Sequence, residues 1–130
     1  MVLLIDAVHT LISCTQEDDF ETRVFNKELA DYLATRSEPI VVVTNARWDR
    51  GKKIRDLLTD YSFEYHSMDN TTPKTDPEYW AHVILYYGFE TEDCFLIDHL
   101  PENLTAAAEI GIEGELFTDN TQTIELLKSL

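Results

Sequence analysis

The stretch VLLIDAVHTL (residues 2–11) carries an uninterrupted apolar run into a carboxylate, Asp6, and reaches a threonine, Thr10, four residues later. A short apolar run bounded by polar residues is typical of a parallel strand that is buried on both faces. Because the active sites of open α/β sheets lie at the carboxyl ends of the strands, this stretch predicts that Asp6 lies at the functional edge of a sheet. The alternative is a turn or helix-capping role for the same carboxylate.

Three further polar clusters follow along the chain. Two of them come directly after short apolar runs, and the third is a lysine in a loop between two prolines. Their residues are Thr44 with Asn45, Lys74, and Asp98 with His99. A carboxylate nucleophile, a hydroxyl group, an ammonium group and a second acid are the parts that phosphoryl or acyl transfer requires.

In this order the clusters resemble the four motifs of the haloacid dehalogenase (HAD) superfamily. Those motifs are a strand-end Asp-x-x-x-Thr, a strand-end Ser or Thr, a Lys before a helix, and an acidic strand end, and the resemblance covers most of the chain. It implies that Asp6 is the catalytic nucleophile and that Thr44 and Lys74 are catalytic as well. It also implies a phosphate site, whose candidate residues are Thr10, Thr44, Asn45 and Lys74.

The resemblance further implies a Mg²⁺ site, although two family acids are replaced. The ligands would be Asp6, the backbone carbonyl of Val8, and Asp98, with Glu102 one helical turn along as a further acidic candidate. Phosphatases of the family carry an acid at the Val8 position, and the fourth motif often carries a second acid where this chain has His99. Because Mg²⁺ prefers oxygen ligands and an absent general acid slows catalysis, we expect weak Mg²⁺ binding and slow turnover.

Each candidate residue also has a simpler structural interpretation. Strand-end residues such as Thr44, Asn45 and Asp98 commonly cap the following helix, and a loop lysine is commonly solvated. His9 and His99 are either polar packing residues or, near neutral pH, proton carriers or ligands for a softer metal than Mg²⁺.

Composition limits the partners and the size of the protein. A chain of 130 residues with 44% hydrophobic composition predicts one domain, residues 1–130. The net charge of −15 argues against binding to nucleic acid or to an anionic membrane. No apolar run is long enough to span a membrane, and two cysteines, Cys14 and Cys94, form no disulfide framework, so we expect a cytoplasmic protein.

The periodicity of apolar residues predicts alternating strands and helices. The expected strands are Val2–Ile5, Ile40–Val43, Phe63–His66, Cys94–Ile97 and Glu115–Phe117. The expected helices are 25–33, 54–61, 77–87, Pro101–Ile110 and Thr121–Leu127. Such alternation favours an α/β fold with a doubly wound, parallel, five-stranded Rossmann-like sheet. The HAD resemblance implies the strand order 5-4-1-2-3, and the short gaps between motifs leave no room for a cap domain. The acidic segment Thr15–Asp19 is a candidate flap.

Two functions from different classes stay open. The first is a HAD-like hydrolase of the phosphatase type, which forms an aspartyl intermediate on Asp6 and acts on a small phosphorylated compound or a protein substrate. The second is a catalytically impaired HAD-like protein with a binding or regulatory role, because Val8 and His99 replace acids. The first motif is closer to the dehalogenase branch, with His9 in place of a glycine, but a dehalogenase needs cap residues that this chain lacks. A homo-oligomer is compatible with a capless fold.

Overall fold

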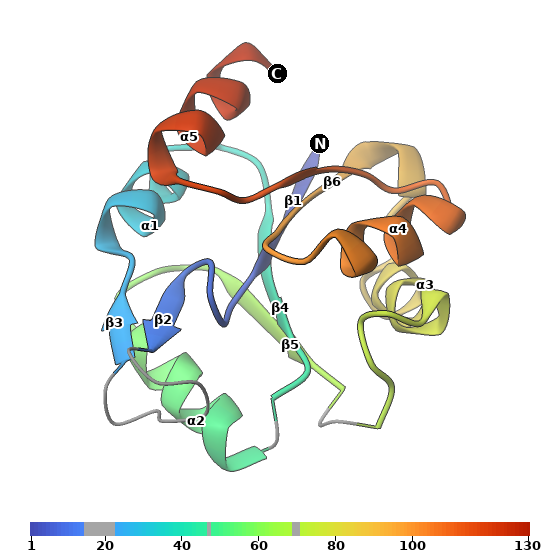
Figure 1. Ribbon diagram of the computed structural model, residues 1–130, viewed down its shortest axis with the longest axis horizontal. Helices are drawn as coiled ribbons and strands as arrows, with labels where there is room; N and C mark the ends of the chain where they lie inside the picture. The colour runs from blue at the N-terminus through green and yellow to red at the C-terminus, as the bar shows by residue number, and fades with distance from the viewer. Residues whose placement is uncertain (15–22, 47, 69–70) are drawn as a thin grey trace.

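The computed structural model describes residues 1–14, 23–46, 48–68 and 71–130, and a five-stranded parallel sheet forms its centre (Figure 1). The strands are β1 (Val2–Asp6), β4 (Ile40–Thr44), β5 (Glu64–Ser67), β6 (Cys94–Asp98) and β7 (Glu113–Leu116). Their order across the sheet is β5-β4-β1-β6-β7. When the parallel strands alone are counted along the chain, this order is 3-2-1-4-5, so the predicted order is confirmed, read from the opposite edge.

Helices cover both faces of this sheet (Figure 1). Within the described ranges these are α1 (Lys27–Ala34), α2 (Trp48–Leu57), α3 (Pro77–Tyr87), α4 (Pro101–Glu109) and α5 (Asn120–Ser129). The apolar residues of α1, α2 and α5 pack in one core, and those of α3 and α4 pack in a second core on the other face. The described part of the chain contains no inserted cap domain. None of the helices described is both long enough and apolar enough to span a membrane.

The central strand, β1, explains why the opening stretch is apolar throughout. β1 pairs with β4 on one side and with β6 on the other. Leu3 and Ile5 contribute to one core, while Val2 and Leu4 contribute to the other. Because both faces of the strand are buried, polar and apolar residues do not alternate along it. Asp6 is the first polar residue that the strand carries to its carboxyl end.

Helix α3 has the boundaries that its end residues predict. The Asp76 side chain accepts a hydrogen bond from the backbone N–H of Glu78, and Pro77 occupies the first helical turn. Gly88 ends the helix with φ of 74°, a left-handed conformation that costs glycine little. The Asp76 cap fixes the start of the helix, directly after the loop that carries Lys74.

A two-stranded antiparallel hairpin was not predicted. It consists of β2 (Ile12–Cys14) and β3 (Arg23–Phe25), in which Ile12 pairs with Phe25. The apolar spacing assigned Phe25 to the next helix, and this was wrong, because Asn26 caps α1 and the helix begins at Lys27. The candidate flap, Thr15–Asp19, lies outside the described residues.

The last parallel strand, β7, begins two residues earlier than predicted, at Glu113, because Gly114 gives no apolar signal. Gly114 pairs with Leu96, and a Cβ atom there would lie 2.6 Å from the Leu96 carbonyl oxygen and 2.8 Å from Leu104. A glycine is therefore required by close packing rather than by backbone conformation.

Gly114→Ala should lower the free energy of unfolding by about 1–3 kcal/mol, because the added methyl group overpacks against a backbone atom. Urea denaturation of the purified variant measures the change. Glu113→Ala, at the exposed neighbouring position, is the matched control. Equal stability of the two variants would show that β6 and β7 accommodate the added methyl group without loss of stability.

Candidate functional site

Three charged side chains meet at the carboxyl edge of the sheet. Asp6 ends β1, Asp98 ends the adjacent strand β6, and Lys74 comes from the loop before α3. The Lys74 ammonium donates a hydrogen bond to Oδ1 of Asp6 and another to Oδ2 of Asp98, the latter at 3.2 Å. The exposed fractions are 2% for Asp6, 0% for Asp98 and 8% for Lys74. The contacts form a buried ion cluster that joins three separate segments of the chain.

The loop after β1 holds the Asp6 carboxylate from the other side. The Thr10 hydroxyl donates to Oδ2 of Asp6 at 2.9 Å, and the backbone N–H groups of Leu11 and Ile12 both donate to the Ala7 carbonyl at 2.9 Å. His9 lies in this tight loop with φ of 72°, in the left-handed region that favours glycine. The loop geometry thus explains why the family pattern often has glycine at this position.

Asp98 is fixed by donors from the start of α4. The backbone N–H of Leu100 donates to its Oδ1 at 3.0 Å, and the Asn103 side-chain amide lies 3.1 and 3.2 Å from its two oxygens. Asn103 is buried. It was not among the predicted site residues, and its position five residues after Asp98, in the first turn of the helix that follows the strand, is the sequence signal that could have identified it.

His99 approaches both carboxylates. Its Nδ1 lies 2.5 Å from Oδ2 of Asp6 and 3.4 Å from Oδ1 of Asp98. Burial opposes the charged imidazolium, but the hydrogen bonds and negative charges of Asp6 and Asp98 outweigh it and raise the pKa of His99 to about 9. His99 therefore carries a positive charge at neutral pH, and Nδ1–H donates to Asp6.

The pKa directions of the other two charged partners agree with a compensated cluster. Burial works against the Lys74 ammonium, yet the charges of Asp6 and Asp98 are stronger, so the pKa of Lys74 is raised. Burial also works against the Asp98 carboxylate, but the His99 hydrogen bond and the Lys74 charge lower its pKa. Two acids thus face two bases, which reduces the cost of burying each charge.

Two aromatic residues of α3 anchor the neighbouring loops. The Tyr79 hydroxyl donates to the Thr44 carbonyl at 2.7 Å, and the Trp80 indole N–H donates to the Lys74 carbonyl at 2.8 Å. Thr44 itself is buried at the carboxyl end of β4, and its Oγ1 accepts from the Ala46 N–H at 3.1 Å. This contact is a local turn ahead of α2, which begins at Trp48, rather than the helix cap considered from the sequence, and it still leaves the hydroxyl proton of Thr44 to donate.

The remaining candidates lie around this cluster. Asn45 follows Thr44, and its Oδ1 is buried without a hydrogen-bond partner among the described residues. Val8 is half-buried in the loop after β1. Glu102 is exposed in the first turn of α4 and does not join the three described side chains that could share a cation.

Those three side chains are Asp6, Asp98 and His99, which each offer one ligand atom within 4.8 Å of the others. Two carboxylates suit a hard cation such as Mg²⁺, whereas the imidazole nitrogen suits a softer one. The donor set fits a divalent cation, but it supplies fewer oxygen ligands than Mg²⁺ prefers.

Comparison with known proteins gives one curated relative of note. The chain is 43% identical over 113 residues to flavin mononucleotide hydrolase 1 of Arabidopsis thaliana, which is chloroplastic by name. The match covers 87% of this chain but only 40% of the relative. No family model matches the chain.

Solved structures share the whole fold. A HAD family enzyme from Bacteroides thetaiotaomicron, in complex with magnesium and inorganic phosphate, has a TM-score of 0.75 at 16% identity, covering 90% of this chain and 93% of that one. A HAD-superfamily hydrolase from Geobacter sulfurreducens has a TM-score of 0.71 at 12% identity, with 97% and 95% covered. At such low identity these likenesses show the fold alone.

Lys74→Met should lower the free energy of unfolding by about 3–5 kcal/mol at neutral pH, because it leaves two buried carboxylates without their shared cation. Chemical denaturation measures this loss. Lys27→Met removes the same group from an exposed ion pair with Asp31 and should leave stability almost unchanged. Similar losses in both variants would contradict a special role for the buried cluster.

The stability that His99 contributes should depend on pH. Its folded-state pKa is raised, so the contribution is complete below the ordinary value of 6.5 and is lost as pH rises through about 9. In the presence of a chelator, the stability advantage of the parent over His99→Asn should shrink by about 1–2 kcal/mol across that interval, since water screens the partly exposed ring. A stability difference between the parent and His99→Asn that stays constant or grows as pH rises would contradict the raised pKa of His99.

Proposed function

We propose that this chain, a HAD superfamily protein by its fold and motif order, is a phosphohydrolase whose nucleophile is Asp6. The observation that carries the proposal is the bridge from Lys74 to both Asp6 and Asp98 at the carboxyl edge of the sheet. This arrangement holds a carboxylate and a cation side by side in a buried site, where electrostatic stabilisation is stronger than in water.

In the proposed reaction, a carboxylate oxygen of Asp6 attacks the phosphorus of a phosphate monoester. The bond from phosphorus to the ester oxygen breaks, and the leaving oxygen takes a proton from water because Val8 offers none. Water then attacks the phosphorus of the aspartyl phosphate, which releases inorganic phosphate and restores Asp6. The absence of a general acid is expected to cost about 10²- to 10⁴-fold in rate.

The phosphoryl oxygens need donors beside the nucleophile. Lys74 supplies an ammonium group, and the Thr44 hydroxyl and the Asn45 backbone N–H lie at the end of the neighbouring strand, ahead of α2. Thr10, whose hydroxyl already contacts Asp6, is the remaining proposed phosphate contact. Charge-assisted hydrogen bonds of this kind both orient the substrate and stabilise the charge that builds up during transfer.

A weakly held Mg²⁺ is part of the proposal. Asp6, Asp98 and the backbone carbonyl of Val8 would hold it, and it would neutralise charge on the phosphoryl group. His99 already provides a positive charge next to both carboxylates, which reduces their attraction for a further cation. A role for Glu102 stays a prediction, because that side chain is exposed outside the cluster.

The proposed substrate is a small phosphorylated compound. The Arabidopsis relative is a flavin mononucleotide hydrolase by name, and this chain spans 40% of its length. A match over 113 of the 130 residues makes a flavin or nucleotide phosphate a better first choice than a protein substrate. The cytoplasmic location, and assembly into a homo-oligomer, stay predictions.

The second candidate function is binding without turnover. It is favoured by the hydrogen bonds to Asp6, whose oxygens accept from Lys74, Thr10 and His99 together. These three hydrogen bonds occupy the carboxylate oxygens of Asp6, and Val8 stands where a phosphatase has an acid. Both features are expected of a protein that uses the HAD scaffold to bind a ligand without turning it over.

Asp6→Asn should reduce hydrolysis of an aryl phosphate to the buffer rate while the protein stays folded, because the amide is nearly isosteric but is not a nucleophile. Phosphate release under excess Mg²⁺ measures this, and circular dichroism checks the fold. Retained turnover in the variant would exclude Asp6 as the nucleophile.

The double variant Val8→Asp/His99→Asp should hydrolyse the same aryl phosphate at least about 10-fold faster than the parent, since it restores a proton donor and a metal ligand. Added carboxylates raise one another's pKa, so saturating Mg²⁺ is needed. A folded double variant that binds Mg²⁺ without turnover would favour the binding protein instead.

A further inference from the structure

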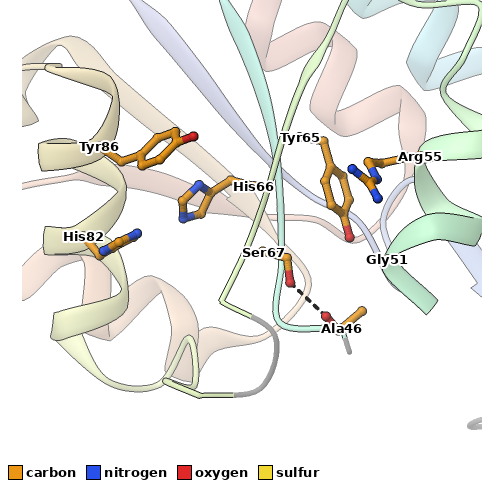
Figure 2. A pocket seen from close by; sticks show the side chains of 8 residues that line it. All are labelled: Ala46, Gly51, Arg55, Tyr65, His66, Ser67, His82 and Tyr86. Atoms are coloured by element: carbon orange, nitrogen blue, oxygen red, sulfur yellow. Dashed lines mark hydrogen bonds between the residues drawn. The ribbon is translucent and has the colours of Figure 1, made fainter. Parts of the chain in front are cut away.

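A cavity of about 360 Å³ lies at the edge strand β5, between α2 and α3. Figure 2 shows His82 and Tyr86 of α3 on one side of the strand, and Arg55 of α2 with Tyr65 on the other. Ser67, at the carboxyl end of β5, lies between the two groups. The cavity is thus built from both layers of helices, and Ser67 and Ala46 of its lining lie at the carboxyl ends of β5 and β4, the end of the sheet that also carries the ion cluster.

Aromatic rings form most of the wall on the α3 side. The ring centroids of His66 and His82 lie 5.2 Å apart, as do those of His66 and Tyr86. His82 and Tyr86 are stacked, with an interplanar angle of 28°. Such walls suit a flat ring, because rings stack on one another over a large area at low entropic cost.

Polar groups accompany these rings. His66 is only 6% exposed, and its Nε2 has no hydrogen-bond partner within the described part of the chain. Burial, helped by the nearby His82, lowers the pKa of His66 to about 4, so the ring is neutral at pH 7 and can donate or accept one hydrogen bond. On the other side, the Arg55 guanidinium lies 5.6 Å from the centre of the Tyr65 ring. A ligand ring with nitrogen or oxygen atoms on its edge would satisfy these groups better than a hydrocarbon would.

The distance from the cavity to the nucleophile restricts the ligand. Ser67 pairs in register with Thr44, and Asp6 pairs with Val43, so the cavity lies two strands away from Asp6. Two strand spacings are roughly 10 Å. The Ser67 hydroxyl donates to the Ala46 carbonyl at 2.8 Å, which connects the cavity to the turn after β4. A ring bonded directly to the phosphate oxygen is too short to occupy both places, whereas a sugar or sugar-alcohol linker spans them.

We propose that this cavity binds the planar heteroaromatic ring of a phosphate monoester whose ring and phosphate are separated by a sugar or sugar-alcohol linker. The inference rests on the proposed phosphohydrolase function of the Asp6 site. In this proposal, residues of β5, α2 and α3 select the substrate. The described residues include no cap domain that could do so instead. Flavin mononucleotide and nucleoside monophosphates both have the required chemistry.

Binding of riboflavin and of adenosine tests the proposal without any need for hydrolysis, because neither probe contains phosphate. Riboflavin binding is followed by its fluorescence and adenosine binding by calorimetry. We expect saturable binding of at least one probe, and the identity of that probe distinguishes a flavin from a purine ligand. His82→Ala/Tyr86→Ala should raise its dissociation constant by about tenfold, as expected for lost stacking. Both side chains are exposed on α3, so the fold should tolerate their removal.

Leu85→Ala is the matched control, because Leu85 is 82% exposed on the same helix and does not line the cavity. It should bind the probe as the parent does. The proposal is overturned by absence of saturable binding of both probes, or by equal weakening in the control and the double variant. If the probe binds in the expected pattern while no phosphate ester is hydrolysed, the cavity assignment stands and the proposed hydrolase function fails. If aryl phosphate is hydrolysed but neither probe binds, the proposed hydrolase function stands and the cavity assignment fails.

Discussion

The Lys74 ammonium, held between the carboxylates of Asp6 and Asp98, is the contact on which the functional edge of the sheet depends. The two acids end adjacent parallel strands, so they would repel one another in a buried setting without a shared cation. The contact also fixes the loop before α3, which the Trp80 indole anchors through the Lys74 carbonyl. The Lys74 ammonium thus holds together the ends of two neighbouring strands and the loop that completes the site.

Most of this arrangement could be predicted from the sequence, because its strongest signals are local. The runs Val2–Ile5, Ile40–Val43 and Cys94–Ile97 predicted the three central strands, since strands that are buried on both faces are apolar throughout. Parallel strands bring their carboxyl ends to one edge, so the convergence of Asp6 and Asp98 followed from topology. Lys74 was already a candidate as a lysine in a loop between two prolines, but only the family resemblance placed it at that edge, because no periodicity locates a loop residue.

The remaining features depend on contacts between distant segments. Phe25 has helical spacing but pairs with Ile12 in a hairpin, where tertiary packing overrides the local pattern. The edge strand β7 lacks an apolar run, and its Gly114 is explained only by the close approach of β6. Likewise, the rotamer that turns His99 toward Asp6 leaves no trace in the sequence, although it decides the charge of the site.

The central claim is that Asp6 is a nucleophile that accepts a phosphoryl group, and beryllium fluoride tests it most directly. This reagent bonds to a reactive aspartate and imitates an aspartyl phosphate, and ¹⁹F NMR detects the bound fluorides. With saturating Mg²⁺, we expect bound-fluoride signals from the parent protein and none from Asp6→Asn. Absence of these signals from the parent, or the same signals from both proteins, would contradict the claim and leave a HAD-like scaffold that binds ligands without covalent catalysis.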